Sequence, residues 1–537
     1  MSRRRLAVQA LASVGLLLAT LPAAAAPRLV VVVAVDQLRP DRLGPELPGG
    51  LGRLVREGRV YAEAVQDHAV TETCPGHATI LTGRHPGAAG IPGNNFFDAE
   101  RSRVVYCAED PSPDAAVLGV PAPAPGRSPR LLRTDTLGDW MRGADSRSRV
   151  FGVSGKDRAA IMLAGRRPDG AWWFQGAGSP GFTTSRYYRP DLPAWVRRFN
   201  DPAAGFLAGL PPVWEHASED GQRPDDYRGE SDRHSRTSAH PLRSADPSLF
   251  ARQLLASPFI DDATLAFSLA LVARQDLGRG PATDLLAVSL SGTDVVGHHY
   301  GPFSLESRDA LDRLDRSLGA FLTGLERRVG RDGLLVVLTA DHGVLPLPEW
   351  LEDQGRATCP VAGGRIGLKG LGLRLLTRLH LGHGFWRWPR SWLLFAGSQV
   401  AVKRPLAEGR GVDPGRVARA TESWLERQPG VAAVWSPEEI RAERSETARL
   451  YRNSYDPERS GDLFVQVAEG CLISAYDTGT THGTPYLYDR RVPLLFWGSG
   501  IQPGAVAGPA RTIDVAPTLA GVLGVPAPPD LDGSPLF

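Results

Sequence analysis

The sequence predicts an α/β fold, in which a largely parallel central sheet is flanked by helices. Three mostly apolar runs have the length of strands that are buried on both faces, as in a parallel sheet. They span Leu29 to Val35, Leu285 to Leu290 and Leu334 to Leu338. A long amphipathic segment between the second and third runs supplies the crossover helix that parallel strands require.

The first predicted strand ends in a candidate ligand. The run from Leu29 to Val35 contains only leucine, valine and alanine, and it stops at Asp36. In open α/β sheets, ligands bind beyond the carboxyl ends of the strands. A lone aspartate at such a position is more often a turn or helix-cap residue. Asp36 is therefore a convincing ligand candidate only together with the other candidate ligands described below.

The second and third predicted strands also lead into acidic and histidine residues. Asp294 and His298 follow the second run, and Asp341 and His342 follow the third. Because parallel strands end at one edge of a sheet, these side chains can converge although they are far apart in the chain. Carboxylate oxygen and imidazole nitrogen together favour zinc or a similar divalent ion.

The segment from Ser304 to Val329 predicts an amphipathic helix that covers the sheet. Ser304 can cap its start. Its apolar residues recur every three or four positions, which is the period of one helix face. They are Leu311, Leu314, Leu318, Phe321 and Leu325.

Thr73 and His482 complete a set of seven candidate site residues. Thr73 lies in Thr-Glu-Thr-Cys-Pro-Gly-His-Ala-Thr, residues 71–79, and His482 lies in Gly-Thr-Thr-His-Gly, residues 479–483. With the strand-end residues they supply three carboxylates, three imidazoles and one hydroxyl. Such a set can build a two-metal site with an alkoxide nucleophile. Each residue alone is weak evidence, but the joint order is hard to obtain by accident.

These motifs resemble the alkaline phosphatase superfamily, and most closely its threonine-nucleophile branch, the PafA-like alkaline phosphatases, which are related to the nucleotide pyrophosphatase/phosphodiesterases. The resemblance covers nearly the whole mature chain and implies an alkaline-phosphatase-like fold with inserted cap segments. Further matching segments are residues 35–39, 90–95, 156–158 and 184–188.

The resemblance implies two zinc ions per chain and a role for each site residue. Asp294, His298 and His482 would hold one zinc ion; Asp36, Asp341 and His342 would hold the second, with Thr73 facing it. Asn94 and the backbone N–H after the nucleophile would hold one phosphoryl oxygen. Lys156 and Arg158 match the pair that contacts the other phosphoryl oxygens in the monoesterase branch. The implied substrates are small-molecule phosphate monoesters.

Two other functions compete with a monoesterase. A phosphodiesterase or nucleotide pyrophosphatase would use the same bimetal site, and an exported binding protein would keep a degenerate one. The complete ligand set argues against the binding protein. A sulfatase, with its Cys-x-Pro-x-Arg motif, is disfavoured because Thr73 stands two residues before Pro75 and His77, not arginine, two residues after it.

Lysine usage singles out Lys156. The chain has 61 basic residues, yet only three are lysines, at positions 156, 369 and 403. A lysine beside Arg158 is then less easily explained as an ordinary surface charge. Lysine offers a compact point charge and arginine a planar fork, so a phosphoryl group that needs both explains the pair.

Residues 1–26 predict a secretory signal peptide, and residues 27–537 a single catalytic domain with cap insertions at roughly 166–255 and 344–480. Three arginines precede an apolar stretch, residues 6–21, and an alanine-rich cleavage region, residues 23–26. A membrane anchor is disfavoured because the stretch is shorter than the roughly 20 residues that span a bilayer. We therefore expect a periplasmic or secreted protein without a stable membrane span in its mature form.

Composition limits the partners. A net charge of +2 gives no indication of nucleic acid. The sequence does not indicate an oligomeric state. Four cysteines in an exported protein allow three disulfide pairings, of which we favour Cys74–Cys107 with Cys359–Cys471.

Overall fold

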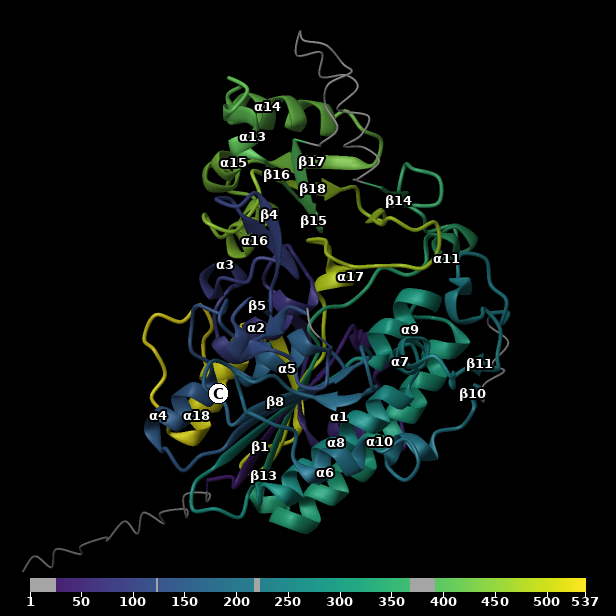
Figure 1. Ribbon diagram of the computed structural model, residues 1–537, viewed down its shortest axis with the longest axis vertical. Helices are drawn as coiled ribbons and strands as arrows, with labels where there is room; N and C mark the ends of the chain where they lie inside the picture. The colour runs from purple at the N-terminus through teal and green to yellow at the C-terminus, as the bar shows by residue number, and fades with distance from the viewer. Residues whose placement is uncertain (1–25, 122–123, 217–222, 368–391) are drawn as a thin grey trace, which may run out of the picture.

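A nine-stranded sheet forms the centre of the molecule (Figure 1). The computed structural model describes residues 26–121, 124–216, 223–367 and 392–537. Within these ranges the strand order is β21-β2-β20-β13-β1-β12-β7-β8-β9. The strands are β1 (Leu29–Val35), β2 (Arg59–Val65), β7 (Val150–Ser154), β8 (Gly170–Gln175), β9 (Gly181–Thr183), β12 (Asp284–Leu290), β13 (Leu334–Thr339), β20 (Leu494–Gly498) and β21 (Gly504–Arg511).

Most neighbouring strands of this sheet are parallel, which confirms the predicted fold class. Strand β1 pairs in parallel with β12 on one side and with β13 on the other. Parallel pairing continues from β12 to β7 and β8, whereas β9 and β20 run antiparallel to their neighbours. Strand β1 has the predicted bounds, β12 begins one residue earlier than predicted, and β13 ends one residue later.

Helices cover both faces of the sheet, and this explains the unbroken apolar runs. Val31 and Val33 of β1 belong to a core with α1, α8 and α10, whereas Val30 and Val32 belong to a core with α2, α4 and α18. A strand that is buried on both faces favours apolar side chains at nearly every position. The helices are α1 (Gly50–Glu57), α2 (Thr73–Thr82), α4 (Leu137–Ala144), α8 (Phe259–Arg274), α10 (Leu305–Val329) and α18 (Val515–Leu523).

The predicted amphipathic helix is α10. Ser304 caps it, because its hydroxyl accepts a hydrogen bond from the backbone N–H of Ser307. Leu314, Leu318 and Phe321 are buried in the core that contains α1 and α8. The apolar spacing in the sequence was therefore sufficient to locate both the helix and its buried face.

A second, smaller sheet forms a separate layer, drawn at the top of Figure 1. It falls within the predicted cap range 344–480 and is antiparallel, in the order β15-β16-β18-β17. The other cap range, 166–255, contains β8 and β9 of the central sheet. It also contains a two-stranded antiparallel sheet, called the hairpin below, whose strands are separated by residues 215–239. The bounds are β15 (Leu393–Ala396), β16 (Gln399–Val402), β17 (Val431–Trp435), β18 (Leu463–Val467), and β10 (Val213–Trp214) with β11 (His240–Pro241) for the hairpin.

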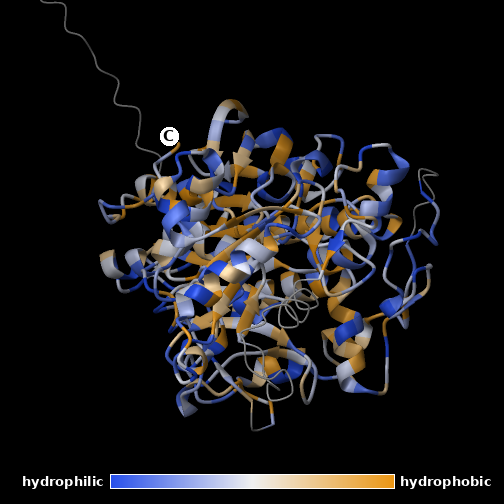
Figure 2. Cartoon of the chain, turned by 90° about the horizontal axis from the view of Figure 1, so that it is seen from above, coloured by the Kyte–Doolittle hydropathy of each residue, from blue (hydrophilic) through white to orange (hydrophobic). Residues whose placement is uncertain are grey.

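Hydrophobic segments are concentrated in the interior, as Figure 2 shows from above. Among the described residues, no single helix is apolar and long enough to cross a membrane. One bent pair, α7 (Pro247–Leu255) with α8, could span a membrane by length and composition only. Helix α8 packs in the core that contains α1 and α10. The predicted signal peptide lies, except for its last residue, outside the described residues.

The two disulfides confirm the favoured pairing. Cys74, in the first turn of α2, is bonded to Cys107, and Cys359 is bonded to Cys471. The first bond ties the start of α2 to the segment that follows Asn94, whose carbonyl accepts a hydrogen bond from the N–H of Cys107. The second bond closes a sequence separation of 112 residues beside the smaller sheet.

Replacing Cys359 and Cys471 together by alanine is expected to lower the free energy of unfolding by about 2–4 kcal/mol, because the cross-link restricts the unfolded chain. Urea unfolding of wild type and variant measures this change. The single variant Cys359→Ala is the control and should lose nearly as much, since either change removes the bond. An unchanged unfolding midpoint in both variants would contradict a stabilising disulfide.

Candidate active site

The carboxyl edge of the central sheet brings the predicted site residues together. Asp36 follows β1, Asp341 follows β13, and Asp294 follows β12 after a short turn. Thr73 begins α2, which follows β2, and Lys156 comes two residues after β7. Strands β1, β7, β12 and β13 run in the same direction, so their ends meet at this edge.

The first expected ligand group is assembled. Asp294 and His298 lie one turn apart on α9 (Gly292–Tyr300). Ligand atoms of Asp294, His298 and His482 all lie within 4.8 Å of one another. The Nε2 atoms of His298 and His482 are 3.2 and 3.7 Å from Oδ1 of Asp294. These three residues can share one metal ion.

The second group contains a histidine that is absent from the predicted set. Asp36 and Asp341 lie with His77, whose Nε2 is 3.2 Å from Oδ1 of Asp36 and whose Nδ1 is 3.3 Å from Oδ2 of Asp341. The expected ligand His342 has its Nε2 3.2 Å from Oδ2 of Asp341. The signal for His77 is its position four residues after Thr73, which places both on one face of α2.

The three expected histidine ligands present the same nitrogen to the site. In each, Nδ1 lies at hydrogen-bonding distance from a backbone carbonyl, which can only accept. Nδ1 therefore carries a proton, and Nε2 is the nitrogen that is turned toward the carboxylates, as in many metal sites. The pairs are His298 with Thr480 at 2.7 Å, His342 with Gly343 at 3.0 Å, and His482 with Thr71 at 2.6 Å.

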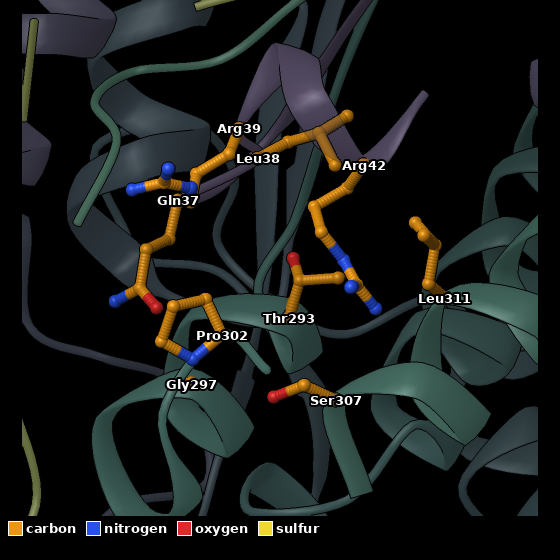
Figure 3. A pocket seen from close by; sticks show the side chains of 9 residues that line it. All are labelled: Gln37, Leu38, Arg39, Arg42, Thr293, Gly297, Pro302, Ser307 and Leu311. Atoms are coloured by element: carbon orange, nitrogen blue, oxygen red, sulfur yellow. The ribbon is translucent and has the colours of Figure 1, made fainter. Parts of the chain in front are cut away.

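Gln37 links the two groups. Its φ angle of 66° is unusual for a residue other than glycine. This turn lets its backbone N–H donate to Oδ1 of Asp341 at 3.1 Å while its amide donates to Oδ1 of Asp294 at 2.8 Å. A side chain at Gly297 would collide with the Gln37 amide oxygen. Figure 3 shows both residues at the wall of a small pocket.

Thr73 is buried at the first position of α2. Its Oγ1 is 3.4 Å from Nη2 of Arg158, in the first turn of α5 (Asp157–Ala164). The backbone N–H of Cys74 donates to Oδ1 of Asn94 at 2.7 Å, so Asn94 also lies at the start of this helix. The hydroxyl therefore faces a cation, as an anionic substrate requires.

Helix α2 lies directly on the end of β13. A Cβ atom at Gly76 would collide with the backbone carbonyl of Asp341. Only glycine permits this approach, because it has no side chain. The backbone contact fixes the distance between Thr73 and the second carboxylate group.

Lys156 contacts the carboxylates rather than the hydroxyl. Its Nζ is 2.9 Å from Oδ2 of Asp36 and 2.5 Å from Oδ2 of Asp294. Lysine is thus shared between the two ligand groups. The arginine of the predicted pair, Arg158, is the one that reaches Thr73.

Asp294 and Asp341 are ionised. Burial would raise the pKa of Asp294, but His298 and Lys156 hold that pKa well below its usual range. Burial likewise opposes ionisation of Asp341, and the neighbouring His342 and His77 outweigh it, so this pKa is also well below its usual range. Ionised carboxylates are the form that binds a metal ion.

The donor set fits divalent metal ions. Burial, together with His342 and His298, holds the pKa of His482 well below its usual value, so its imidazole is neutral. Within the described chain, Nε2 of His77, Nε2 of His342 and Oδ2 of Asp341 are buried without a hydrogen-bond partner. Buried polar atoms without a partner are costly, and metal ions would satisfy them.

Comparison with known proteins gives consistent results. Residues 30–486 match the family described as type I phosphodiesterase / nucleotide pyrophosphatase. The alkaline phosphatase PhoK of Sphingomonas sp. is 33% identical, over 95% of this chain and 91% of its own length.

Solved structures extend the comparison. The crystal structure of alkaline phosphatase PafA superposes with a TM-score of 0.83 at 30% identity and covers 95% of this chain and 98% of its own. The murine ectonucleotide pyrophosphatase / phosphodiesterase 5 has a TM-score of 0.55 at 15% identity, over 94% and 97% of the two chains, and shares the fold.

A solved variant of PafA carries substitutions of a threonine, an asparagine, a lysine and an arginine. In that chain they stand at the same mutual spacing as Thr73, Asn94, Lys156 and Arg158 do here. The sequence resemblance, the fold and the spacing agree. The chain therefore belongs to the type I phosphodiesterase / nucleotide pyrophosphatase family of the alkaline phosphatase superfamily, in its PafA-like alkaline phosphatase branch.

Proposed function

We propose that the chain is an exported, zinc-dependent alkaline phosphatase that hydrolyses phosphate monoesters through a phosphothreonine on Thr73. The observation that carries the proposal is the position of the Thr73 hydroxyl, beside Arg158 and on a helix whose Gly76 packs against Asp341 of the second ligand group. The alkaline phosphatases among its full-length relatives support hydrolysis of monoesters.

Two zinc ions fit the two ligand groups. Asp294, His298 and His482 would hold one of them. Asp36, Asp341 and His342 would hold the other, with His77 in reach as a fourth ligand. When bound, the two ions would activate the threonine oxygen and stabilise the departing alkoxide.

Thr73 carries the covalent chemistry in this proposal. Its Oγ forms a bond to phosphorus, and the bond from phosphorus to the ester oxygen breaks, so the alcohol leaves. Water then attacks the phosphothreonine, releases phosphate and restores the hydroxyl. Arg158 compensates the charge of the transferring group, whose reaction depends mainly on positioning and electrostatics. Asn94 orients one phosphoryl oxygen.

A phosphodiesterase or nucleotide pyrophosphatase remains the second candidate, because the matched family carries that description. A diester has an organic group in place of one phosphoryl oxygen. Arg158 beside Thr73 favours the monoester, since a monoester dianion has a further charged oxygen to compensate.

Thr73→Ala is expected to abolish the phosphoenzyme and to lower monoester turnover by on the order of 10³-fold or more, because the nucleophile is lost. Zinc content should equal that of wild type, whereas Asp294→Ala should lose one ion. Acid quenching followed by intact-protein mass measures the covalent adduct, and elemental analysis measures the metal. Thr73→Ser is the control, which should still form the adduct. An adduct on Thr73→Ala would exclude the assigned nucleophile.

Replacing Lys156 and Arg158 by alanine is expected to lower kcat/KM for an aryl phosphate monoester by about 10²–10³-fold, because a cation beside the transferring group is lost. The matching diester should lose far less. Arg158→Ala alone should produce most of this difference between the monoester and the diester. The single variant is informative because Lys156 also contacts two expected metal ligands, so its loss could affect both substrates. The exposed Arg166→Ala serves as the control. Equal losses for both esters would favour the phosphodiesterase.

Export predicts a processed N-terminus. The mature protein should begin between Ala25 and Arg28 and accumulate outside the cytoplasm. A cut directly before Pro27 is disfavoured, so the preferred site is one or two residues earlier. N-terminal sequencing of soluble, active protein measures this. A sequence that starts at Met1 or Ser2 would contradict export.

A further inference from the structure

A cluster of histidines and carboxylates lies outside the candidate active site. It is formed by strand β11 of the hairpin, by two residues of the segment between β10 and β11, and by the first turn of α10. Ligand atoms of His216, Asp225 and Glu306 all lie within 4.8 Å of one another. Nε2 of His240 is 3.4 Å from Oε1 of Glu306. Figure 1 shows the hairpin at the edge of the molecule, beside α9 and α10.

The hairpin is held rigidly against these helices. Trp214 of β10 pairs with His240 of β11, and its indole N–H donates to Asp309 of α10 at 2.8 Å. The hydroxyl of Tyr300, at the end of α9, lies 3.2 Å from Nδ1 of His240. Trp214 and His240 are therefore positioned by contacts with α9 and α10, whereas His216 and Asp225 lie in the segment between the two strands.

His240 presents its second nitrogen to the cluster. Its Nδ1 is 3.0 Å from the carbonyl of His234, which can only accept, so Nδ1 carries the proton. Nε2 then faces Oε1 of Glu306. This is the same arrangement that the expected histidine ligands of the active site show.

Polar atoms in the cluster lack partners. Within the described chain, Nε2 of His240, Oε1 of Glu306 and Nδ1 of His216 are buried without a hydrogen bond. The side chains of His240 and Glu306 are only 3% and 1% exposed. A buried carboxylate oxygen without a hydrogen-bond donor is costly.

Neighbouring arginines are engaged with other carboxylates. Arg223 donates to Glu230 at 2.5 Å and to the carbonyl of Tyr300. Arg313 donates to Asp309 at 2.5 Å. Arg223 directs its hydrogen bonds to these partners but still interacts electrostatically with Glu306, so Arg223 and the cluster share the balancing of that charge.

We infer that His216, His240, Asp225 and Glu306 form a third metal site, which takes zinc or a similar divalent ion in a structural role. Two imidazoles and two carboxylates make a four-ligand set that suits tetrahedral zinc, whereas calcium and magnesium prefer oxygen ligands alone. The complete set of four protein ligands leaves no open position, as in structural sites.

The proposed ion would stabilise the chain segments that position His298 and His482. The N–H of Ser231 donates to the carbonyl of His299 on α9, next to the expected ligand His298, and the N–H of Gly479 donates to the carbonyl of Gly229 near His482. The segment that carries the cluster therefore contacts both chain segments that hold the first ligand group.

The test compares zinc content after saturation with zinc and buffer exchange. His216→Ala with Glu306→Gln should bind one zinc ion per chain fewer than wild type, and the thermal stabilisation by added zinc should shrink. His234→Ala removes a histidine from the same segment without removing a ligand, so it should bind as many ions as wild type. Circular dichroism verifies folding of each variant.

The inference is tested by the difference in zinc content between wild type and the double variant. This difference does not depend on how many ions the candidate active site binds, because that site is the same in both proteins. Equal content in wild type and the double variant would overturn the third site and favour a His240–Glu306 ion pair. If the double variant does not fold, Glu306→Gln alone, which keeps the side-chain volume, gives the same comparison. A deficit in His234→Ala equal to that of the cluster variant would also overturn the assignment.

Discussion

Three carboxylates buried at one edge of the central sheet are the constraint on which the rest of the site depends. Asp36, Asp294 and Asp341 are almost inaccessible to solvent. Buried charge of one sign is tolerated only where cations and hydrogen-bond donors surround it. The neighbouring elements supply both, through Lys156 from the end of β7 and Gln37 from the end of β1.

The two ligand groups are coupled rather than independent. Gln37 bonds a carboxylate of each group, and Lys156 contacts a carboxylate of each. The rings of His342 and His482, one from each expected group, stack with centroids 3.5 Å apart. A shift in one group must therefore be transmitted to the other, which fixes the separation of the two ions that the site would hold.

The sequence predicted what depends on local pattern. Apolar runs that end in Asp36 and Asp341, and the four-residue spacing of Asp294 and His298, are local, so strands and expected ligands could be located. The left-handed turn at Gln37 could not be predicted, since glutamine does not favour it. The contacts of Lys156 with its two aspartates also depend on packing between residues more than a hundred positions apart.

Because Gly76 has no side chain, α2 contacts the backbone of Asp341 directly. The position of Thr73 is therefore set by a different element from the one that carries Arg158. The backbone contact between α2 and Asp341 sets where the proposed nucleophile Thr73 stands, whereas Arg158, proposed to compensate the charge of the substrate, lies on a different helix, α5. The chemistry can thus be held constant while the preference for a substrate changes. Such modularity gives a physical route by which one ancestral scaffold diversifies into enzymes for different esters, and it marks α5 as the element to randomise in directed evolution.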